Sequence, residues 1–404
     1  AKLSIMCLAP AVLTCCLMSA YRGYYQGMQN MYPTSISQII EAVTKMIFGL
    51  GFSGGVMYLT QREYSLHATV LGRSYPSPEQ VQAVIAQLAS GAAVLGVSLS
   101  TAAGLVYLML RWRKKGDGVS QQQLMHAPKP QDSSTLLKRI LVIAIPVCLG
   151  SLAVNLSGII DLLTVTGRLS HVMDTAPQQL LACYGQNIPQ AELVNGTVHN
   201  YLYGAYSGKA VVIANLVPAL TTGMAVSALP AVAESFARGN RLRTQKSIQM
   251  VLRITALFCV PAGLGISALS QEVCSLFFGM NNEVMIGAPL LRVLGLASIF
   301  IALTGTTNSL LQAVGRVSLP VKLILIGSAI KLAMNYLLVG IPQLNIQAAP
   351  WSTLVCYVVI TLLSLIALRS TVGPLGAFGV FGKPLLAGLL CAAFARLTQN
   401  MLMQ

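Results

Sequence analysis

Long apolar stretches, separated by short polar ones, run through almost the whole chain. A helix needs about 20 predominantly apolar residues to cross the hydrocarbon core of a bilayer. About ten stretches between Leu3 and Arg396 approach or exceed that length with few charges. The pattern therefore predicts an all-α polytopic membrane protein with about ten spans. We place the spans near residues 3–20, 35–59, 82–110, 138–167, 201–235, 248–269, 286–312, 319–341, 347–368 and 376–397.

Composition and charge support this reading and give it an orientation. Hydrophobic residues make up 55% of the 404-residue chain and charged residues 9%, where soluble domains average about 25% charged. The net charge of +15 would suggest a nucleic-acid partner in a soluble protein, but here most basic residues lie on every second loop. Cytoplasmic loops of membrane proteins carry such an excess. We therefore expect no nucleic-acid partner.

The basic residues of the two sides are very unequal in number. The loops assigned to the cytoplasm carry Arg22, Arg111, Arg113, Lys114, Lys115, Lys129, Lys138, Arg139, Arg238, Arg241, Arg243, Lys246, Arg316, Lys322, Arg369 and Lys383. The opposite side carries Lys2, Arg62, Arg73, Arg168 and Lys209. With this orientation the first span begins outside, so we expect further helices before Ala1, and the chain reads as a fragment of a longer protein.

The polar stretch after the third span predicts a division into two helical lobes. It is charged, rich in glutamine and interrupted by two prolines, as linkers are. We expect the remainder of an N-terminal lobe with three helices, a cytoplasmic linker, a C-terminal lobe with six helices, and a truncated extra helix, at residues 1–111, 112–137, 138–370 and 371–404.

A weak internal repeat agrees with two lobes. Four features of the first two spans recur around the seventh and eighth spans, at offsets of 286 to 288 residues: the start of the span, a Gln, a Pro and a Lys. In this repeat Lys331 is the counterpart of Lys45. Secondary transporters are often built from such parallel repeats, with the substrate between them. Chance similarity among apolar helices is the alternative.

Three stretches resemble a known family. They are AYRGYYQGMQNMYPTSISQIIE at 20–41, LYGAYSG at 202–208 and AVSALPAVAE at 225–234. They are similar to the stage V sporulation protein B branch of the polysaccharide exporters, close to the MurJ-type lipid II flippases of the multidrug/oligosaccharidyl-lipid/polysaccharide superfamily. That resemblance implies fourteen helices, of which the ten spans would be the fourth to the thirteenth.

Ionisable residues inside spans are costly, so each is a candidate functional residue. Glu41 and Lys45 are spaced i, i+4 and predict a pair on one helical face, lining a cavity or bracing a helix end. Asp161 lies toward the outer half of the fourth span, where a lone carboxylate would bind a proton or sodium ion, or pair with Arg168.

Three cations complete the candidate set. Lys209 follows a run of small residues and suits a diphosphate group in an internal cavity, or snorkels to the outer interface. Lys331 lies in the middle of its span. Arg22 ends the first span as a positive-inside anchor or a contact to a substrate headgroup.

The resemblance implies a flippase of the bacterial cytoplasmic membrane that moves an undecaprenyl-diphosphate-linked saccharide by alternating access, in cell-wall synthesis or sporulation. Its partners would be this substrate, membrane lipids and a coupling proton or sodium ion. Four scattered histidines and nine cysteines without CxxC spacing predict no metal or other cofactor. The alternatives are an ion-coupled drug exporter and a membrane glycosyltransferase or ligase, which needs paired carboxylates.

Overall fold

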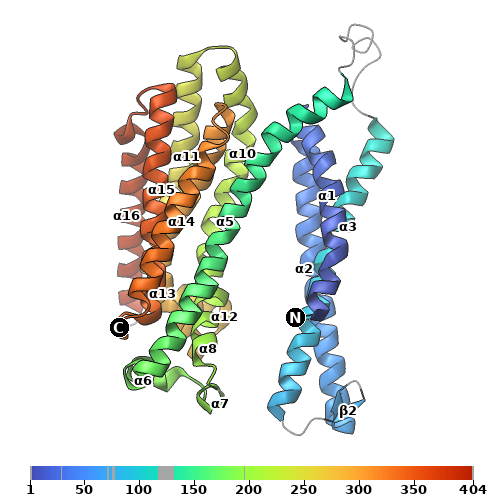
Figure 1. The fold of residues 1–404 in the computed structure, drawn as a ribbon, viewed down its shortest axis with the longest axis vertical. Helices are drawn as coiled ribbons and strands as arrows, with labels where there is room; N and C mark the ends of the chain where they lie inside the picture. The colour runs from blue at the N-terminus through green and yellow to red at the C-terminus, as the bar shows by residue number, and fades with distance from the viewer. Residues whose placement is uncertain are drawn as a thin grey trace. The chain divides into compact units, whose positions relative to one another are not determined.

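The computed structural model describes residues 2–28, 30–70, 72–74, 78–116, 132–194 and 196–402. These residues form helices almost throughout, with one two-stranded ribbon (Figure 1). The chain divides into two compact units, residues 1–130 and 131–404. The boundary falls inside the predicted linker, most of which, residues 117–131, lies outside the described residues.

Unit 1 is a three-helix bundle with a small hairpin. Its elements are α1 (Lys2–Gly27), α2 (Tyr32–His67), β1 (Thr69–Val70), β2 (Arg73–Ser74) and α3 (Pro78–Lys115). The strands are antiparallel, with Val70 opposite Arg73. Helix α3 packs against both α1 and α2, and the aromatic rings of Tyr24, Tyr25 and Trp112 meet edge to face at one end of the bundle.

Unit 2 is a larger helical bundle. Its elements are α5 (Ser133–Thr175), α6 (Pro177–Tyr184), η1 (Gly185–Asn187), α7 (Gln190–Val194), α8 (Val198–Ala205), the π-helix η2 (Tyr206–Ala210), α9 (Val211–Ala214), α10 (Leu216–Ala237), α11 (Arg241–Ala268), α12 (Ser270–Phe278), α13 (Asn282–Ala313), α14 (Leu319–Leu338), η3 (Asn345–Gln347), α15 (Ala348–Val372) and α16 (Ala377–Leu402). Helix α16, predicted as a separate extra helix, packs within this unit against α11.

Helix α13 is the centre of unit 2. In its most apolar window 61% of the residues are buried, against 17% for α16. Small residues let α11 approach it closely, because a Cβ on Gly295 would lie 2.7 Å from the backbone nitrogen of Ser267. Such contacts between small residues drive helix association inside membranes, where the hydrophobic effect between helices is weak.

Eight described helices are long and apolar enough to cross a membrane, or nine if the bent pair Val198–Gly223 and Ser227–Ala237 forms one span. This confirms the all-helical polytopic fold and matches nine of the ten predicted spans. The tenth, 138–167, lies within α5, which is helical but is not among these candidates. The chain is a multi-pass membrane protein.

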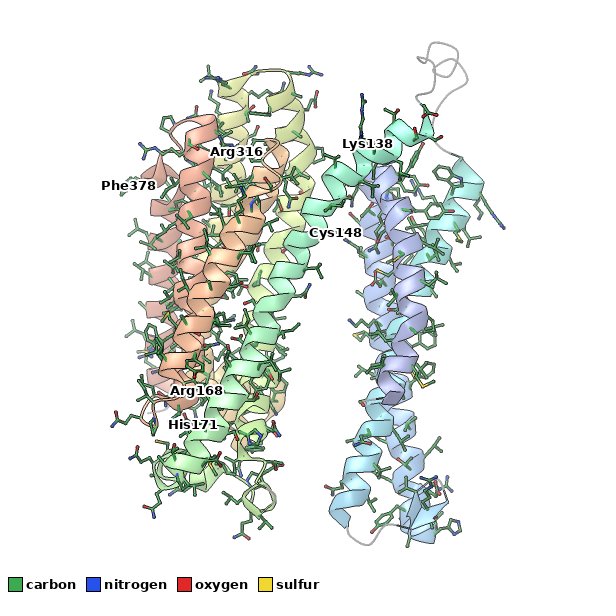
Figure 2. All side chains as sticks on the ribbon, viewed as in Figure 1. Lys138, Cys148, Arg168, His171, Arg316 and Phe378 are labelled. Carbon is green, nitrogen blue, oxygen red and sulfur yellow. The ribbon has the colours of Figure 1, made fainter. Side chains whose placement is uncertain are left out.

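Basic residues assigned to opposite sides of the membrane lie toward opposite ends of unit 2. Lys138 and Arg316, predicted on the cytoplasmic side, lie toward one end, and Arg168, predicted outside, lies toward the other (Figure 2). A buried polar contact links α6 to η3, where the Tyr184 hydroxyl donates to Asn345 Oδ1 at 3.0 Å. Burial raises the pKa of that hydroxyl.

Candidate functional site

The main polar site of unit 2 is a buried ion pair. Lys331 Nζ lies 2.6 Å from Asp161 Oδ2, and the two side chains are only 4% and 11% exposed. Helix α14 supplies the lysine and α5 the carboxylate. Isolated charges at this depth would cost several kcal/mol each, so the opposite charges stabilise each other only because the contact is close and hydrogen-bonded.

Further polar side chains complete the shell of this pair. Asn335 Nδ2 donates to Asp161 Oδ1 at 2.9 Å and to Thr164 Oγ1 at 3.2 Å. Lys331 Nζ also donates to Ser157 Oγ at 3.2 Å. Both oxygens of Asp161 are therefore bonded.

The local sequence explains why these groups converge. Ser157, Asp161 and Thr164 are spaced at helical intervals of four and three residues, and Lys331 and Asn335 are four apart, so each set shares one helical face. Helix α15 closes the site with Ser352, whose hydroxyl donates to Asn335 Oδ1. The polar centre thereby ties three helices, α5, α14 and α15, into one packed group.

Asp161 is therefore not the lone carboxylate that the sequence predicts, and it does not pair with Arg168. The guanidinium of Arg168 stacks on the Tyr336 ring, with Cζ 4.6 Å from the ring centroid. It also lies against Gly340, where a Cβ would be 2.7 Å from Cζ. Its Nε is buried without a hydrogen-bond partner in the described structure.

Lys209 also has a carboxylate partner. It lies in the π-helix η2, and its Nζ is 2.9 Å from Glu283 Oε2 at the start of α13 and 4.6 Å from the centre of the Phe278 ring. Its side chain is 15% exposed and that of Glu283 is 41% exposed. Cys183 and Cys274 are free thiols.

Unit 1 has a second ionic site. Arg22 on α1 reaches α2, where its Nη2 lies 2.9 Å from Glu41 Oε2 and its Nε donates to Ser37 Oγ at 2.9 Å. The predicted pair of Glu41 with Lys45 is wrong, because Glu41 bonds across to α1 instead. Lys45 is exposed on α2 and makes no ion pair among the described residues.

The structure thus brings two candidates, Asp161 and Lys331, into one site, and Arg22 and Glu41 into another, and leaves Lys209 and Lys45 apart from both. Sequence reasoning missed Asn335, Ser157 and Glu283. The i, i+4 spacings of Ser157 to Asp161 and of Lys331 to Asn335 were the available signals. Among the described residues no group of three His, Cys, Asp or Glu side chains is placed to hold a metal ion.

Known proteins show clear similarity to this chain. The family described as Lipid II flippase MurJ matches residues 203–404. Lipid II flippase MurJ of Bacillus subtilis (strain 168) is 24% identical over 343 residues, which cover 82% of this chain and 54% of that protein. Stage V sporulation protein B of the same organism is 21% identical over 364 residues, covering 89% and 60%.

A third relative in that organism, the uncharacterized membrane protein YabM, is 22% identical over 350 residues, covering 86% of this chain and 56% of its own length. The chain thus spans little more than half the length of these relatives. No solved structure matches it. The family match covers half of the chain, and the resemblance read from residues 20–41, 202–208 and 225–234 is confirmed: the chain belongs to the MurJ family of multi-pass membrane proteins.

Proposed function

We propose that this protein takes part in moving a lipid-linked saccharide precursor, carried on undecaprenyl diphosphate, across the bacterial cytoplasmic membrane for cell-wall or envelope synthesis. The observation that carries the proposal is the family match, which begins at Tyr203 and covers helices α10 to α16 of unit 2. Transport by alternating access needs packed helical groups that move as bodies, and the polar centre on α5, α14 and α15 supports one such group.

The charges favour transport over saccharide chemistry. A glycosyltransferase or ligase needs a free acid or base facing its substrate. Here Asp161, Glu41 and Glu283 each bond to a cation at 2.6 to 2.9 Å. We therefore assign these carboxylates to holding helices together, and we propose no catalytic residue.

The ion pairs also limit which cations are available to bind a diphosphate group. Lys209 and Lys331 each hold a carboxylate, so a phosphate would have to displace it. Arg168 is partly exposed and makes no ion pair among the described residues, and guanidinium groups bind phosphate oxygens well. We propose Arg168 as the headgroup contact of unit 2; Arg22 of unit 1 already holds Glu41, so a phosphate would have to displace that carboxylate as well.

The ammonium of Lys331 occupies the position at which a coupling cation would neutralise Asp161. An external sodium ion would gain little there while the lysine is present, since the carboxylate is already matched in charge and bonded at both oxygens. We therefore propose that transport does not depend on sodium binding at Asp161. Replacing sodium by potassium on both sides should leave the rate unchanged.

The direct test is translocation of fluorescent lipid II in liposomes that contain the protein, with protein-free liposomes as the blank. Chemical quenching of the outer leaflet reports how much lipid has crossed. We expect the protein to cause loss of protected lipid. The rate of this loss should be unchanged in Lys45→Gln. It should be about tenfold slower or more in Arg168→Ala, because a charged hydrogen bond to phosphate is lost. Export of a cationic dye with no movement of lipid II would instead support the drug exporter, and modification of the saccharide without movement would support an enzyme.

A further inference from the structure

A cavity of about 180 Å³ lies inside unit 2, between α5, α10, α13, α14 and α15. Its walls combine isoleucine side chains with hydroxyl and amide groups, among them those of Thr222, Ser328 and Asn308. Of the lining residues, Thr222 and Gly305 are exposed, whereas Ser328 and Cys356 are buried. The space is large enough for several water molecules, each of which takes about 30 Å³ in the liquid.

One wall of this cavity belongs to the buried ion pair. Ser157 lines the cavity and also accepts the hydrogen bond from Lys331 Nζ. The bonds to Ser157 and Asp161 use two of the three donors of the ammonium group. The third donor, next to the Ser157 wall of the cavity, is well placed to bind water.

A second observation points to water in the same place. Asn308 lines the cavity, and its Oδ1 is buried without a hydrogen-bond partner in the described structure. A buried acceptor left unpaired costs about 1–3 kcal/mol, and buried waters normally satisfy such groups. Most of the wall is apolar, and entirely apolar cavities stay dry, but this wall also presents an unsatisfied amide oxygen and hydroxyl groups that can hold water.

We infer that this cavity is a water-filled chamber which opens at Thr222 and Gly305 and carries solvent to the Lys331–Asp161 pair. The ligand it takes is water, and through water the pair exchanges protons with the outside although both side chains are almost fully buried. The inference does not depend on the proposed function, because solvent access to the chamber is independent of the cargo.

Two native cysteines make the test possible. Cys356 lines the chamber, whereas Cys259 is buried in an apolar cluster and is absent from its lining. In single-cysteine variants of the whole chain in liposomes, iodoacetamide should alkylate Cys356 at least about tenfold faster than Cys259, because only Cys259 must wait for local opening. Mass spectrometry gives both rates, and labelling in denaturant checks that both thiols are intact.

Two glycines provide a matched pair for the mouth. Gly305 and Gly265 are both helical and both have open space where a Cβ would stand, but only Gly305 lines the chamber. Gly305→Leu should slow labelling of Cys356 at least about fivefold by blocking the mouth, and Gly265→Leu should leave it unchanged. Equal rates for Cys356 and Cys259, an unchanged rate in Gly305→Leu, or labelling of Cys356 by an apolar maleimide but not by iodoacetamide would each overturn the inference.

Discussion

The two ionic sites of this protein solve different problems. Arg22 and Glu41 in unit 1 join two neighbouring helices and remain 17% and 28% exposed, whereas Lys331 and Asp161 in unit 2 are 4% and 11% exposed and have a shell of further polar groups. Because the first pair is partly exposed, solvent can stabilise either charge when the pair is broken, so breaking it costs little free energy. Solvent cannot replace a lost partner in the second, buried pair, so its stability depends on every partner being present. The degree of burial, rather than the charge itself, therefore decides how much each pair contributes to the stability of the fold.

Breaking the buried pair should have the largest effect. Lys331→Met leaves the Asp161 carboxylate without its cation, and removing one partner of a buried pair costs about 3–5 kcal/mol. We expect a fall of that size in the free energy of unfolding, measured by circular dichroism in detergent with denaturant. Asp161→Asn should behave similarly. A loss below about 1 kcal/mol for both variants would contradict the burial of the pair.

Removing the amide of the shell should have an intermediate effect. Asn335→Leu deletes donors to Asp161 and Thr164 and removes one of the two acceptors of the Ser352 hydroxyl. We expect a loss of about 1–3 kcal/mol in the same unfolding measurement, with Asn335→Asp as a comparison that adds a second negative charge near Lys331. If Asn335→Leu were as stable as the wild type, the amide would not belong to the shell.

The exposed pair should matter less. Arg22→Met removes an ion pair that solvent partly screens, so we expect a loss of about 0.2–1 kcal/mol. Arg22→Lys keeps the charge but shortens the reach to Ser37 and should lose less. A loss from Arg22→Met equal to that from Lys331→Met would show that the two sites do not differ as described.

Lys45 gives the smallest expected effect and sharpens the contrast with Lys331, its counterpart in the predicted repeat. It is exposed and makes no ion pair among the described residues, so Lys45→Gln should change the free energy of unfolding by less than about 0.5 kcal/mol. Thermal melting of Lys45→Gln beside Lys331→Met would show the difference in stability between the two variants. A large loss would reveal a partner for Lys45.

These differences show what the sequence can and cannot predict. Apolar length predicted nine of the candidate spans, because membrane helices follow from local composition. It also identified Asp161 and Lys331 separately as costly charges. Their pairing joins positions 170 residues apart, and no local pattern states that distance. The i, i+4 spacing did not predict the partner of Glu41, because Glu41 pairs with Arg22 on the neighbouring helix α1 instead.

Lys209 shows a second limit. Its partner Glu283 lies just before the apolar part of α13, where a charge needs no special explanation, so nothing in the sequence marked it. The π-helix that turns Lys209 toward it is likewise a local irregularity without a sequence signal. Sequence therefore located the charges of this protein, and tertiary contacts decided their roles.

A double-mutant cycle on Asp161 and Lys331 tests the central claim most directly. The unfolding free energies of the wild type, Asp161→Asn, Lys331→Met and the double variant give the coupling between the two side chains without assuming what either does alone. We predict that the double variant recovers much of the lost stability, with a coupling energy of about 2 kcal/mol or more. Additive losses, with a coupling below about 0.5 kcal/mol, would contradict the buried pair as the polar centre of unit 2.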